Sequence, residues 1–284
     1  MKLFIVLLAV AYCFEPLITR SQVEYLKRTV SWEVEDYENN IFRGWSVDEA
    51  KALLGYTGFG DFDVEPIDEV TVPATIDWRG ANCDHGPQNQ GSCGSCWAFA
   101  IVGMMSYRCC AAKGDHGWLS PQELVSCDKA NHGCQGGQLA SPMNYVQKNK
   151  GLVTEKCYPY LAKNDQCPNK CKDGSDWAKA HVCNCLEFKK CPGVAGMKSC
   201  LASGPATFGF GVEKEFMHYK SGIYKCTGTK FIGGHAVLAM GYSETPECHY
   251  YVKNSWGPTW GMKGYFNFAC GTCRMEGGVA CTKF

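Results

Sequence analysis

The sequence predicts an α+β fold with two lobes, one helical and one rich in strands. Between residues 96 and 151 the apolar runs and cap signals describe helices, whereas beyond about residue 186 short β-branched or aromatic runs are separated by turn residues. Helices that come first and strands that come later are typical of an α+β arrangement. The expected strands are ATFGFGV, GHAVLAMGY, HYYVKN and GYFNF.

The first residues have the composition of a secretory signal peptide. Lys2 precedes an apolar run that is too short to span a bilayer, and Ala9-Val10-Ala11 offers small residues for cleavage. We expect a signal peptide over residues 1–20, with a poorly fixed cleavage point; a buried N-terminal strand or helix is the alternative. The mature protein is expected in a lysosome-like vacuole or outside the cell. No later apolar run approaches the length needed to span a bilayer, so we expect no membrane partner.

Residues 21–72 are acidic, hold scattered aromatic residues and contain no cysteine. Within them, residues 47–55 predict a short amphipathic helix that ends at Gly55. A small unit without cysteines before a cysteine-rich domain predicts a removable propeptide over 21–72 and a folded domain over 73–284. A linker or an N-terminal arm is the alternative.

Three helices follow in order. Residues 96–112 are apolar nearly all round, so we expect a buried helix that ends near Gly114. Ser120 as N-cap and Glu123 in a capping box predict the start of a second helix. Residues 141–151 form the third.

Charge and cysteine content limit the possible functions. The 284 residues hold 28 basic and 28 acidic side chains, so nothing points to a nucleic-acid partner. Twenty cysteines indicate disulfides formed in an oxidising compartment. Nineteen of them fall in residues 83–284, and this odd number leaves at least one thiol unpaired.

Cys93 and Cys96 in NQGSCGSCWAFA fit three chemistries. A zinc site could add Cys270 and Cys273, but structural zinc is disfavoured where thiols oxidise, and we expect no metal. A redox pair expects a preceding βαβ unit, which the sequence lacks. The third interpretation is one structural cysteine beside one nucleophile.

A nucleophilic cysteine needs a base, a residue that orients the base, and donors for an oxyanion. His235 in GGHAV follows Cys96 by 139 residues, and Asn254 in KNSWG follows 19 residues later. Gln90 lies six residues before Cys96, near enough to offer a side-chain N–H. The four residue types in this order predict nucleophilic catalysis.

The blocks QGSCGSCWAF, GCQGG, GGHAV and NSWGPTWG resemble the signature blocks of papain-family cysteine proteases, from about Val72 to the C-terminus. The resemblance implies a papain-like fold, with a helical lobe packed on a β-barrel-like lobe and the active site in the groove between them. It also implies a peptidase catalytic domain over 73–284 that needs no cofactor and acts as a monomer on protein and peptide substrates.

The resemblance assigns the catalytic roles. Cys96, at the start of the buried helix, would be a thiolate paired with protonated His235, with a pKa in the range of roughly 3.5–7.5. Asn254 would hold the His235 ring, with Trp256 covering their hydrogen bond. Gln90 and the Cys96 backbone N–H would form the oxyanion hole.

Gly136 and Gly137 lack side chains, so an extended substrate could pair with their backbone. Met275 is expected at the floor of the S2 pocket, which favours an apolar P2 residue; a slip of one residue would place Glu276 there and admit arginine. The other substrate-binding residues that the resemblance implies are Leu139, Trp256 and Trp260.

Disulfides are also implied by the resemblance. The expected pairs are Cys93–Cys134, Cys83–Cys110, Cys127 with Cys167 or Cys171, Cys157 with the other of these two, and Cys226–Cys270. Eight cysteines have no assigned partner, namely Cys109, Cys183, Cys185, Cys191, Cys200, Cys248, Cys273 and Cys281.

The short N-terminal segment resembles the propeptide of cathepsin B, which lies in the cleft in the reverse direction and inhibits its own enzyme. Cathepsin B also carries a loop with paired histidines that limits it to C-terminal dipeptides. Between Cys157 and Cys167 this chain has no histidine. We therefore expect an endopeptidase; the alternatives are a catalytically silent binding homologue, a disulfide-exchange protein using Cys93 and Cys96, and a cysteine-rich structural protein.

Overall fold

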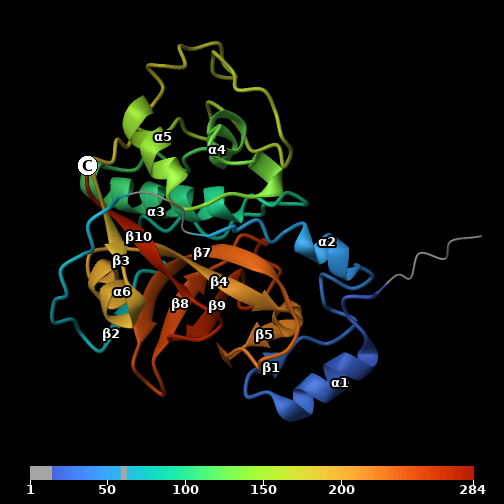
Figure 1. The fold of residues 1–284 in the computed structure, drawn as a ribbon. Helices are drawn as coiled ribbons and strands as arrows, with labels where there is room; N and C mark the ends of the chain where they lie inside the picture. The colour runs from blue at the N-terminus through green and yellow to red at the C-terminus, as the bar shows by residue number, and fades with distance from the viewer. Residues whose placement is uncertain (1–14, 59–62) are drawn as a thin grey trace, which may run out of the picture.

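The computed structural model describes residues 15–58 and 63–284, and it has a helical lobe packed on a strand-rich lobe (Figure 1). This confirms the α+β, two-lobe prediction. The helices are α1 (Arg20–Thr29), α2 (Val47–Lys51), α3 (Cys96–Lys113), α4 (Pro121–Cys127), α5 (Ser141–Asn149) and α6 (Gly193–Leu201), with 3₁₀ turns at Gly133–Gln135 and Lys214–His218. The strands are β1 (Glu33–Val34), β2 (Thr75–Asp77), β3 (Glu187–Cys191), β4 (Ala206–Glu213), β5 (Tyr219–Ser221), β6 (Ile223–Tyr224), β7 (Phe231–Ser243), β8 (His249–Lys253), β9 (Tyr265–Ala269) and β10 (Glu276–Lys283).

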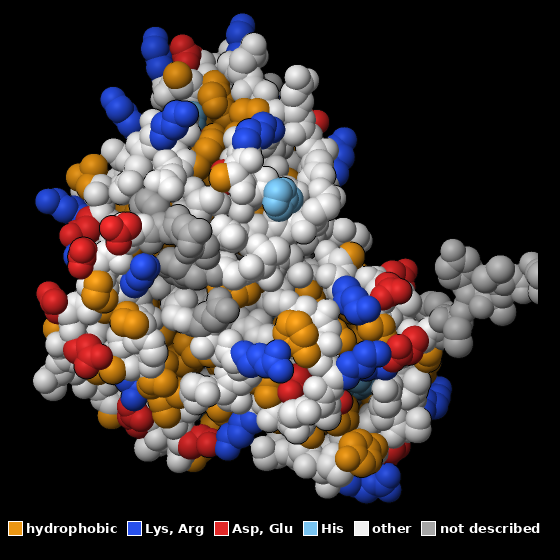
Figure 2. Space-filling view, viewed as in Figure 1, with side chains coloured by type: hydrophobic (Ala, Val, Ile, Leu, Met, Phe, Trp, Pro, Cys, Tyr) orange, Lys and Arg blue, Asp and Glu red, His pale blue; other side chains and the backbone are white. Residues whose placement is uncertain are grey.

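The main sheet has the strand order β3-β10-β4-β7-β8-β9-β6, with β2 paired to β7, and all of these pairs are antiparallel except β6–β9. Successive residues of a strand point to opposite faces. In β4, Phe208 and Phe210 therefore enter the core of the strand lobe, while Gly209 between them and Gly211 after them face the other way. On the face shown in Figure 2, basic and acidic side chains are interspersed over this lobe.

Helix α3 is the centre of the helical lobe, and it lies between α4, α5 and the sheet (Figure 1). Its side chains are buried from Cys96 to Cys109, and the chain turns away at Gly114, where φ is +99°. A helix that is apolar on every side is stable only when it is surrounded by protein. The predicted burial and end of this helix are confirmed.

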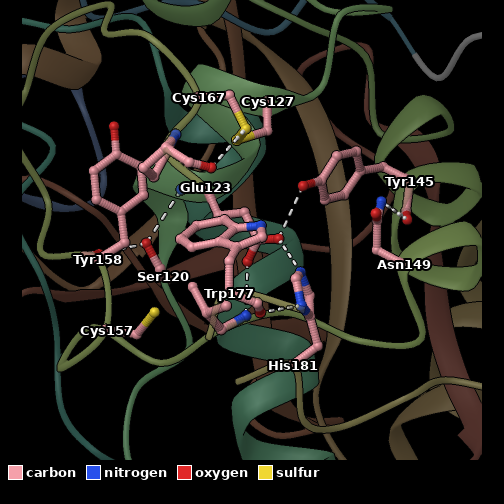
Figure 3. Close-up of polar contacts among 12 residues, drawn as sticks. Ser120, Glu123, Cys127, Tyr145, Asn149, Cys157, Tyr158, Cys167, Trp177 and His181 are labelled. Atoms are coloured by element: carbon pink, nitrogen blue, oxygen red, sulfur yellow. Dashed lines mark hydrogen bonds and ion pairs between the residues drawn. A yellow bond between two sulfur atoms is a disulfide. The ribbon is translucent and has the colours of Figure 1, made fainter. Parts of the chain in front are cut away.

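The predicted capping box of α4 is half right. Ser120 Oγ accepts a hydrogen bond from the Glu123 N–H at 3.1 Å. The Glu123 carboxylate does not return to the cap, because it is fully buried and accepts hydrogen bonds from Tyr145 Oη (2.9 Å) and the Val153 N–H (2.7 Å) (Figure 3). His181 Nε2 lies 2.8 Å from the same carboxylate. This buried cluster joins α4, α5 and the 150–182 segment.

The described residues hold nine disulfides. The pairs predicted for Cys83, Cys93, Cys127 and Cys157 are confirmed, with Cys127 bonded to Cys167 and Cys157 to Cys171. The previously unassigned cysteines form Cys109–Cys183, Cys185–Cys281 and Cys191–Cys200.

The predicted pair Cys226–Cys270 is wrong. Cys270 bonds to Cys248, and Cys226 bonds to Cys273. The register of β8 on β9 explains the exchange, because His249 lies opposite Ala269 and so places the cysteines that adjoin them side by side. The Cys270 N–H donates to the Cys248 carbonyl at 3.0 Å.

The segment 15–58 lies along one side of the strand lobe (Figure 1), and its buried side chains share the core of that lobe. Leu17, Val23, Trp32 and Phe42 belong to the same buried cluster as the sheet. The expected helix over 47–55 ends early, at Lys51, because the residues that follow cross between the two lobes as an extended chain.

The predicted signal peptide lies largely outside the described residues, which begin at Glu15. Within the described part, Leu17 is buried and α1 begins at Arg20. The helices within residues 15–58 and 63–284 include none that is both long enough and apolar enough to cross a bilayer.

Candidate active site

Cys96 begins α3 at the junction of the two lobes, and it is the free cysteine of the described residues. Cys93 is bonded to Cys134, so Cys93 and Cys96 do not form a redox pair in this structure. Cys270 and Cys273 are also in disulfides and cannot complete a zinc site with them. One structural cysteine therefore stands beside one free thiol, as the third interpretation expects.

Strand β7 brings His235 to this thiol from the strand lobe. The backbone N–H of Ala236, the next residue, lies within hydrogen-bond reach of the Cys96 sulfur. His235 Nε2 lies 2.7 Å from Asn254 Oδ1, and its Nδ1 is buried without a hydrogen bond. Asn254 follows the end of β8 directly, so antiparallel pairing of β7 with β8 sets the position of the amide.

Trp256 covers the histidine. Its ring stacks on the His235 ring with centroids 4.8 Å apart and an interplanar angle of 28°. Trp260 packs against Trp256 in an edge-on arrangement at 5.0 Å. Both tryptophans are buried in the described chain, so they shield the bond between His235 and Asn254 from water.

Gln90 joins the two lobes through its side-chain amide. Its Nε2 donates to the carbonyl oxygens of Cys93 (2.8 Å) and Leu53 (2.9 Å). Its Oε1 accepts a hydrogen bond from Ser255 Oγ at 2.6 Å. The amide N–H that could stabilise an oxyanion is therefore held in place and engaged by a carbonyl of the N-terminal segment.

That segment occupies the cleft beside Gly137. The Gly137 N–H donates to the Gly55 carbonyl at 2.8 Å, and the Thr57 N–H donates to the Gly137 carbonyl at 3.0 Å. The pairing of Tyr56 with Gly137 is parallel. Gly136 has φ of +116°, a left-handed conformation that favours glycine.

Burial controls the charge state of the site. Burial raises the pKa of Cys96 to about 11, although the N–H groups of Ala236 and Gly55 oppose it. Burial also lowers the pKa of His235 to about 4, although the hydrogen bond with Asn254 opposes it. The low thiol pKa that the sequence suggested is absent from this covered state, because residues 53–57 exclude the water that would stabilise an ion pair.

Residues 72–282 match the family described as papain family cysteine protease. The chain belongs to the papain family of cysteine proteases. It is 36% identical to "Cathepsin B-like CP3" of Giardia intestinalis over 94% of this chain and 93% of that protein. It is 39% identical to "Pro-cathepsin H" of Bos taurus over 75% of this chain and 64% of that protein.

Solved structures of zymogens share the fold of this cysteine protease. "proCathepsin B S9 from Trypanosoma congolense" has a TM-score of 0.84 over 95% of this chain and 99% of that chain, at 24% identity, a likeness of fold alone. The digestive procathepsin L2 proteinase of Tenebrio molitor larval midgut has a TM-score of 0.78 and 27% identity over 92% and 87% of the two chains.

The expected substrate-binding residues Leu139 and Met275 lie in or against the cores of the two lobes. Leu139 is fully buried in the core of the helical lobe. Met275 packs against the core of the strand lobe and does not line the cavity beside Tyr56. Arg274 lines that cavity in its place, because Cys273 and Arg274 both have φ near +55° and turn the chain there. Glu276 begins β10.

Two residues beside this cavity, Gly209 and Phe231, were not predicted from the sequence. For Gly209 the available signal was the alternation of phenylalanine and glycine in ATFGFGV, because a strand with one bulky face and one bare face leaves space on the bare side. Phe231 lies outside that motif, and no pattern in the sequence pointed to it.

Proposed function

We propose that this protease is a cysteine endopeptidase made as a secreted zymogen, with Cys96 as nucleophile and His235 as its acid and base. The observation that carries the proposal is the free Cys96 thiol at the start of α3. Strand β7 contacts this thiol at Ala236, and the preceding residue, His235, is hydrogen-bonded to Asn254. The N-terminus of a helix and a neighbouring imidazolium both favour a thiolate once water reaches the site.

The chemistry follows from these positions. The Cys96 thiolate attacks the carbonyl carbon of a peptide bond, and His235 gives a proton to the leaving amine. His235 then accepts a proton from water, which attacks the acyl-enzyme and releases the second product. Gln90 Nε2 and the Cys96 backbone N–H would stabilise the oxyanion, at about 3–4 kcal/mol per donor.

Residues 21–72 act as the inhibitory propeptide in this proposal, after a signal peptide over 1–20 and before the catalytic domain over 73–284. The Leu53 carbonyl uses the Gln90 amide that the oxyanion would need. The parallel pairing at Gly137 supports inhibition, because the chain direction is opposite to that of an antiparallel substrate strand. The many disulfides support passage through the secretory pathway.

The segment between Cys157 and Cys167 supports endopeptidase activity. Tyr160 Oη donates to the Gln90 carbonyl at 2.8 Å and lies 2.6 Å from Ser95 Oγ, so the segment is tied to the helical lobe. It has no histidine to bind a substrate's terminal carboxylate. An internally quenched peptide with an amidated C-terminus should be cut in its interior; release of C-terminal dipeptides alone would contradict this.

The central test compares the wild-type chain with Cys96→Ala after activation at mildly acidic pH. We expect the wild type to hydrolyse a fluorogenic peptide and to take up one equivalent of a thiol-directed electrophile at Cys96. The variant should do neither, while its circular dichroism matches the wild type. Equal hydrolysis by both proteins would refute the role of Cys96.

A further inference from the structure

Tyr160 lies between the two backbone segments that supply the proposed oxyanion donors. Its hydroxyl donates a hydrogen bond to the Gln90 carbonyl at 2.8 Å. The Ser95 hydroxyl lies 2.6 Å from the Tyr160 oxygen. Because a tyrosine hydroxyl has one proton and that proton is used on Gln90, Ser95 is the donor of the second bond. One phenol therefore joins Gln90 to the residue directly before Cys96.

Each partner of Tyr160 carries or adjoins a donor that the proposed reaction needs. The side-chain amide of Gln90 is one oxyanion donor, and the Cys96 backbone N–H is the other. The Cys96 N–H belongs to the first turn of α3, whose N–H groups have no acceptor within the helix and so favour an anion. Ser95 is the N-cap residue of α3 but makes no side-chain cap hydrogen bond, so its hydroxyl is available to Tyr160.

The helical lobe holds this phenol in place. The Tyr160 ring packs edge-on against Phe99 of α3, with centroids 4.7 Å apart. The next residue, Leu161, donates its N–H to Gln122 Oε1 of α4 at 2.8 Å. Burial, with a smaller contribution from the charge of Cys96, raises the pKa of Tyr160 to about 12, although the hydrogen bond from the serine opposes it. The hydroxyl therefore keeps its proton, and remains a donor, at neutral and acidic pH.

Gln90 is held on its other side by the strand lobe. Its N–H donates to the Ser255 carbonyl at 2.8 Å, and its Oε1 accepts a hydrogen bond from Ser255 Oγ at 2.6 Å. Its Nε2 also donates to the Leu53 carbonyl of the N-terminal segment at 2.9 Å. When that segment leaves, the Leu53 bond is lost, but the bond from Tyr160 stays and ties the Gln90 backbone to the lobe that holds Cys96.

We propose that Tyr160 is a positioning residue that fixes the distance between the two oxyanion donors, Gln90 Nε2 and the Cys96 N–H. The inference rests on the proposed peptidase function. Oxyanion donors act only when they are aimed at the point where negative charge develops, and a displacement of about 1 Å can lower the rate by about 100-fold. A phenol that bonds to both donor segments keeps them in register during turnover.

The test compares Tyr160→Phe with Tyr158→Phe, each made in the full chain and activated in solution. Both changes remove one hydroxyl from the same loop and keep the ring. Tyr158 Oη is bonded within the helical lobe, to Ser126 Oγ (3.0 Å) and Asp165 Oδ2 (3.2 Å). We expect Tyr160→Phe to lower kcat for a fluorogenic peptide by about tenfold or more, with KM within about threefold of wild type. Tyr158→Phe should change neither value by more than about threefold.

Two further readouts separate positioning from a general structural role. Iodoacetamide alkylates Cys96 when the sulfur displaces iodide from a saturated carbon, and no oxyanion forms. The rate of alkylation in Tyr160→Phe should therefore stay within about threefold of wild type. In a Gln90→Ala background one oxyanion donor is already missing, so adding Tyr160→Phe should lower kcat by about threefold or less.

The outcomes distinguish this inference from the proposed function. Equal kcat values for Tyr160→Phe and Tyr158→Phe, with an active wild type, would overturn the positioning role and leave the peptidase intact. The same holds if Tyr160→Phe slows alkylation as much as it slows hydrolysis, because the thiol itself would then be disturbed. Absence of both alkylation and hydrolysis in the wild type would refute the peptidase function, and the role of Tyr160 with it.

Discussion

Gly55→Ala should open the cleft of the unprocessed chain. A Cβ atom at this position would lie 1.8 Å from the Gly94 carbonyl oxygen and 2.5 Å from its carbonyl carbon. Both are backbone atoms beside Cys93, which a disulfide holds in place. Residues 53–57, which cross the cleft between the two lobes (the crossing segment), therefore have to move, since they are less constrained than the disulfide-bonded backbone around Gly94.

The expected size follows from the hydrogen bonds that this movement breaks. Three backbone hydrogen bonds hold the crossing segment in the cleft. The Gly55 carbonyl accepts from the Gly137 N–H at 2.8 Å, and the Thr57 N–H donates to the Gly137 carbonyl at 3.0 Å. The Tyr56 N–H donates to the Gly234 carbonyl at 3.1 Å. Each contributes about 0.5–1.5 kcal/mol, so the loss of all three weakens the closed state by about 1.5–4.5 kcal/mol. At about 1.4 kcal/mol per factor of ten, the open population rises by about tenfold to 1,500-fold.

The assay is alkylation of Cys96 in the full chain at neutral pH, followed by intact mass. The rate reports how often the thiol becomes accessible, because the buried sulfur is fully shielded when the crossing is closed. Ala52→Ser is the matched control, since it adds one atom at an exposed side chain one turn earlier. If Gly55→Ala reacts within about threefold of this control, the crossing does not shield Cys96 as inferred.

Three further predictions concern charge and orientation. Asn254→Ala should lower kcat by about 10- to 100-fold, because a charge-assisted hydrogen bond contributes about 1.5–3 kcal/mol. The same bond raises the pKa of His235, whose protonated form the mechanism needs, so its loss should shift the alkaline limb of the pH profile to lower pH; an unchanged profile would contradict this. Hydrogen bonds from lysines of the catalytic domain hold the pKa of Glu15 below its ordinary 4.5, so their stabilisation is present above that value and is lost as pH falls through the lowered pKa. Glu15→Gln, made in a chain that retains residues 1–20, should therefore speed Cys96 alkylation at about pH 6 and have no effect in stronger acid. Burial lowers the pKa of His181, but the hydrogen bond and charge of Glu123 outweigh it and raise the pKa above 6.5. The stabilisation is therefore full below 6.5 and is lost as pH rises through the raised pKa. In a Cys96→Ala background, His181→Gln should lower the free energy of unfolding in urea by about 3 kcal/mol at about pH 5.5 and by less above the raised pKa; an equal loss at both pH values would refute the linkage.

The core of the candidate site could be predicted from the sequence because chemistry limits the choice. A nucleophilic cysteine needs a base and a residue that orients the base, and Cys96, His235 and Asn254 stand in sequence blocks that resemble those of the papain family. The structure places them at the start of α3, within β7 and directly after β8. The helix of α3 was predictable for a similar reason, since its uniform apolar surface needs burial on every side.

The errors arise where tertiary contacts decide. The partner of Cys270 depends on strand register, which no local pattern of cysteines encodes. The role of Met275 in S2 stays a prediction, but the side chain that lines the cavity could not be identified from the sequence, because two residues with positive φ redirect the chain just before Met275. The Glu123 carboxylate left its cap for partners far along the chain, since a buried charge takes the best available donors.

Phe42 packs edge-on against Trp256, and Trp32 lies against Tyr219 and Tyr224. Cleavage after this segment would thus strip aromatic partners from the tryptophan that covers the catalytic histidine. In the proposed zymogen, the contacts that keep this segment on the cleft also belong to the buried core, so a chain that has lost the segment lacks part of the core in which it folded. The proposed maturation is then irreversible, and the working lifetime of the processed enzyme depends on how slowly it unfolds.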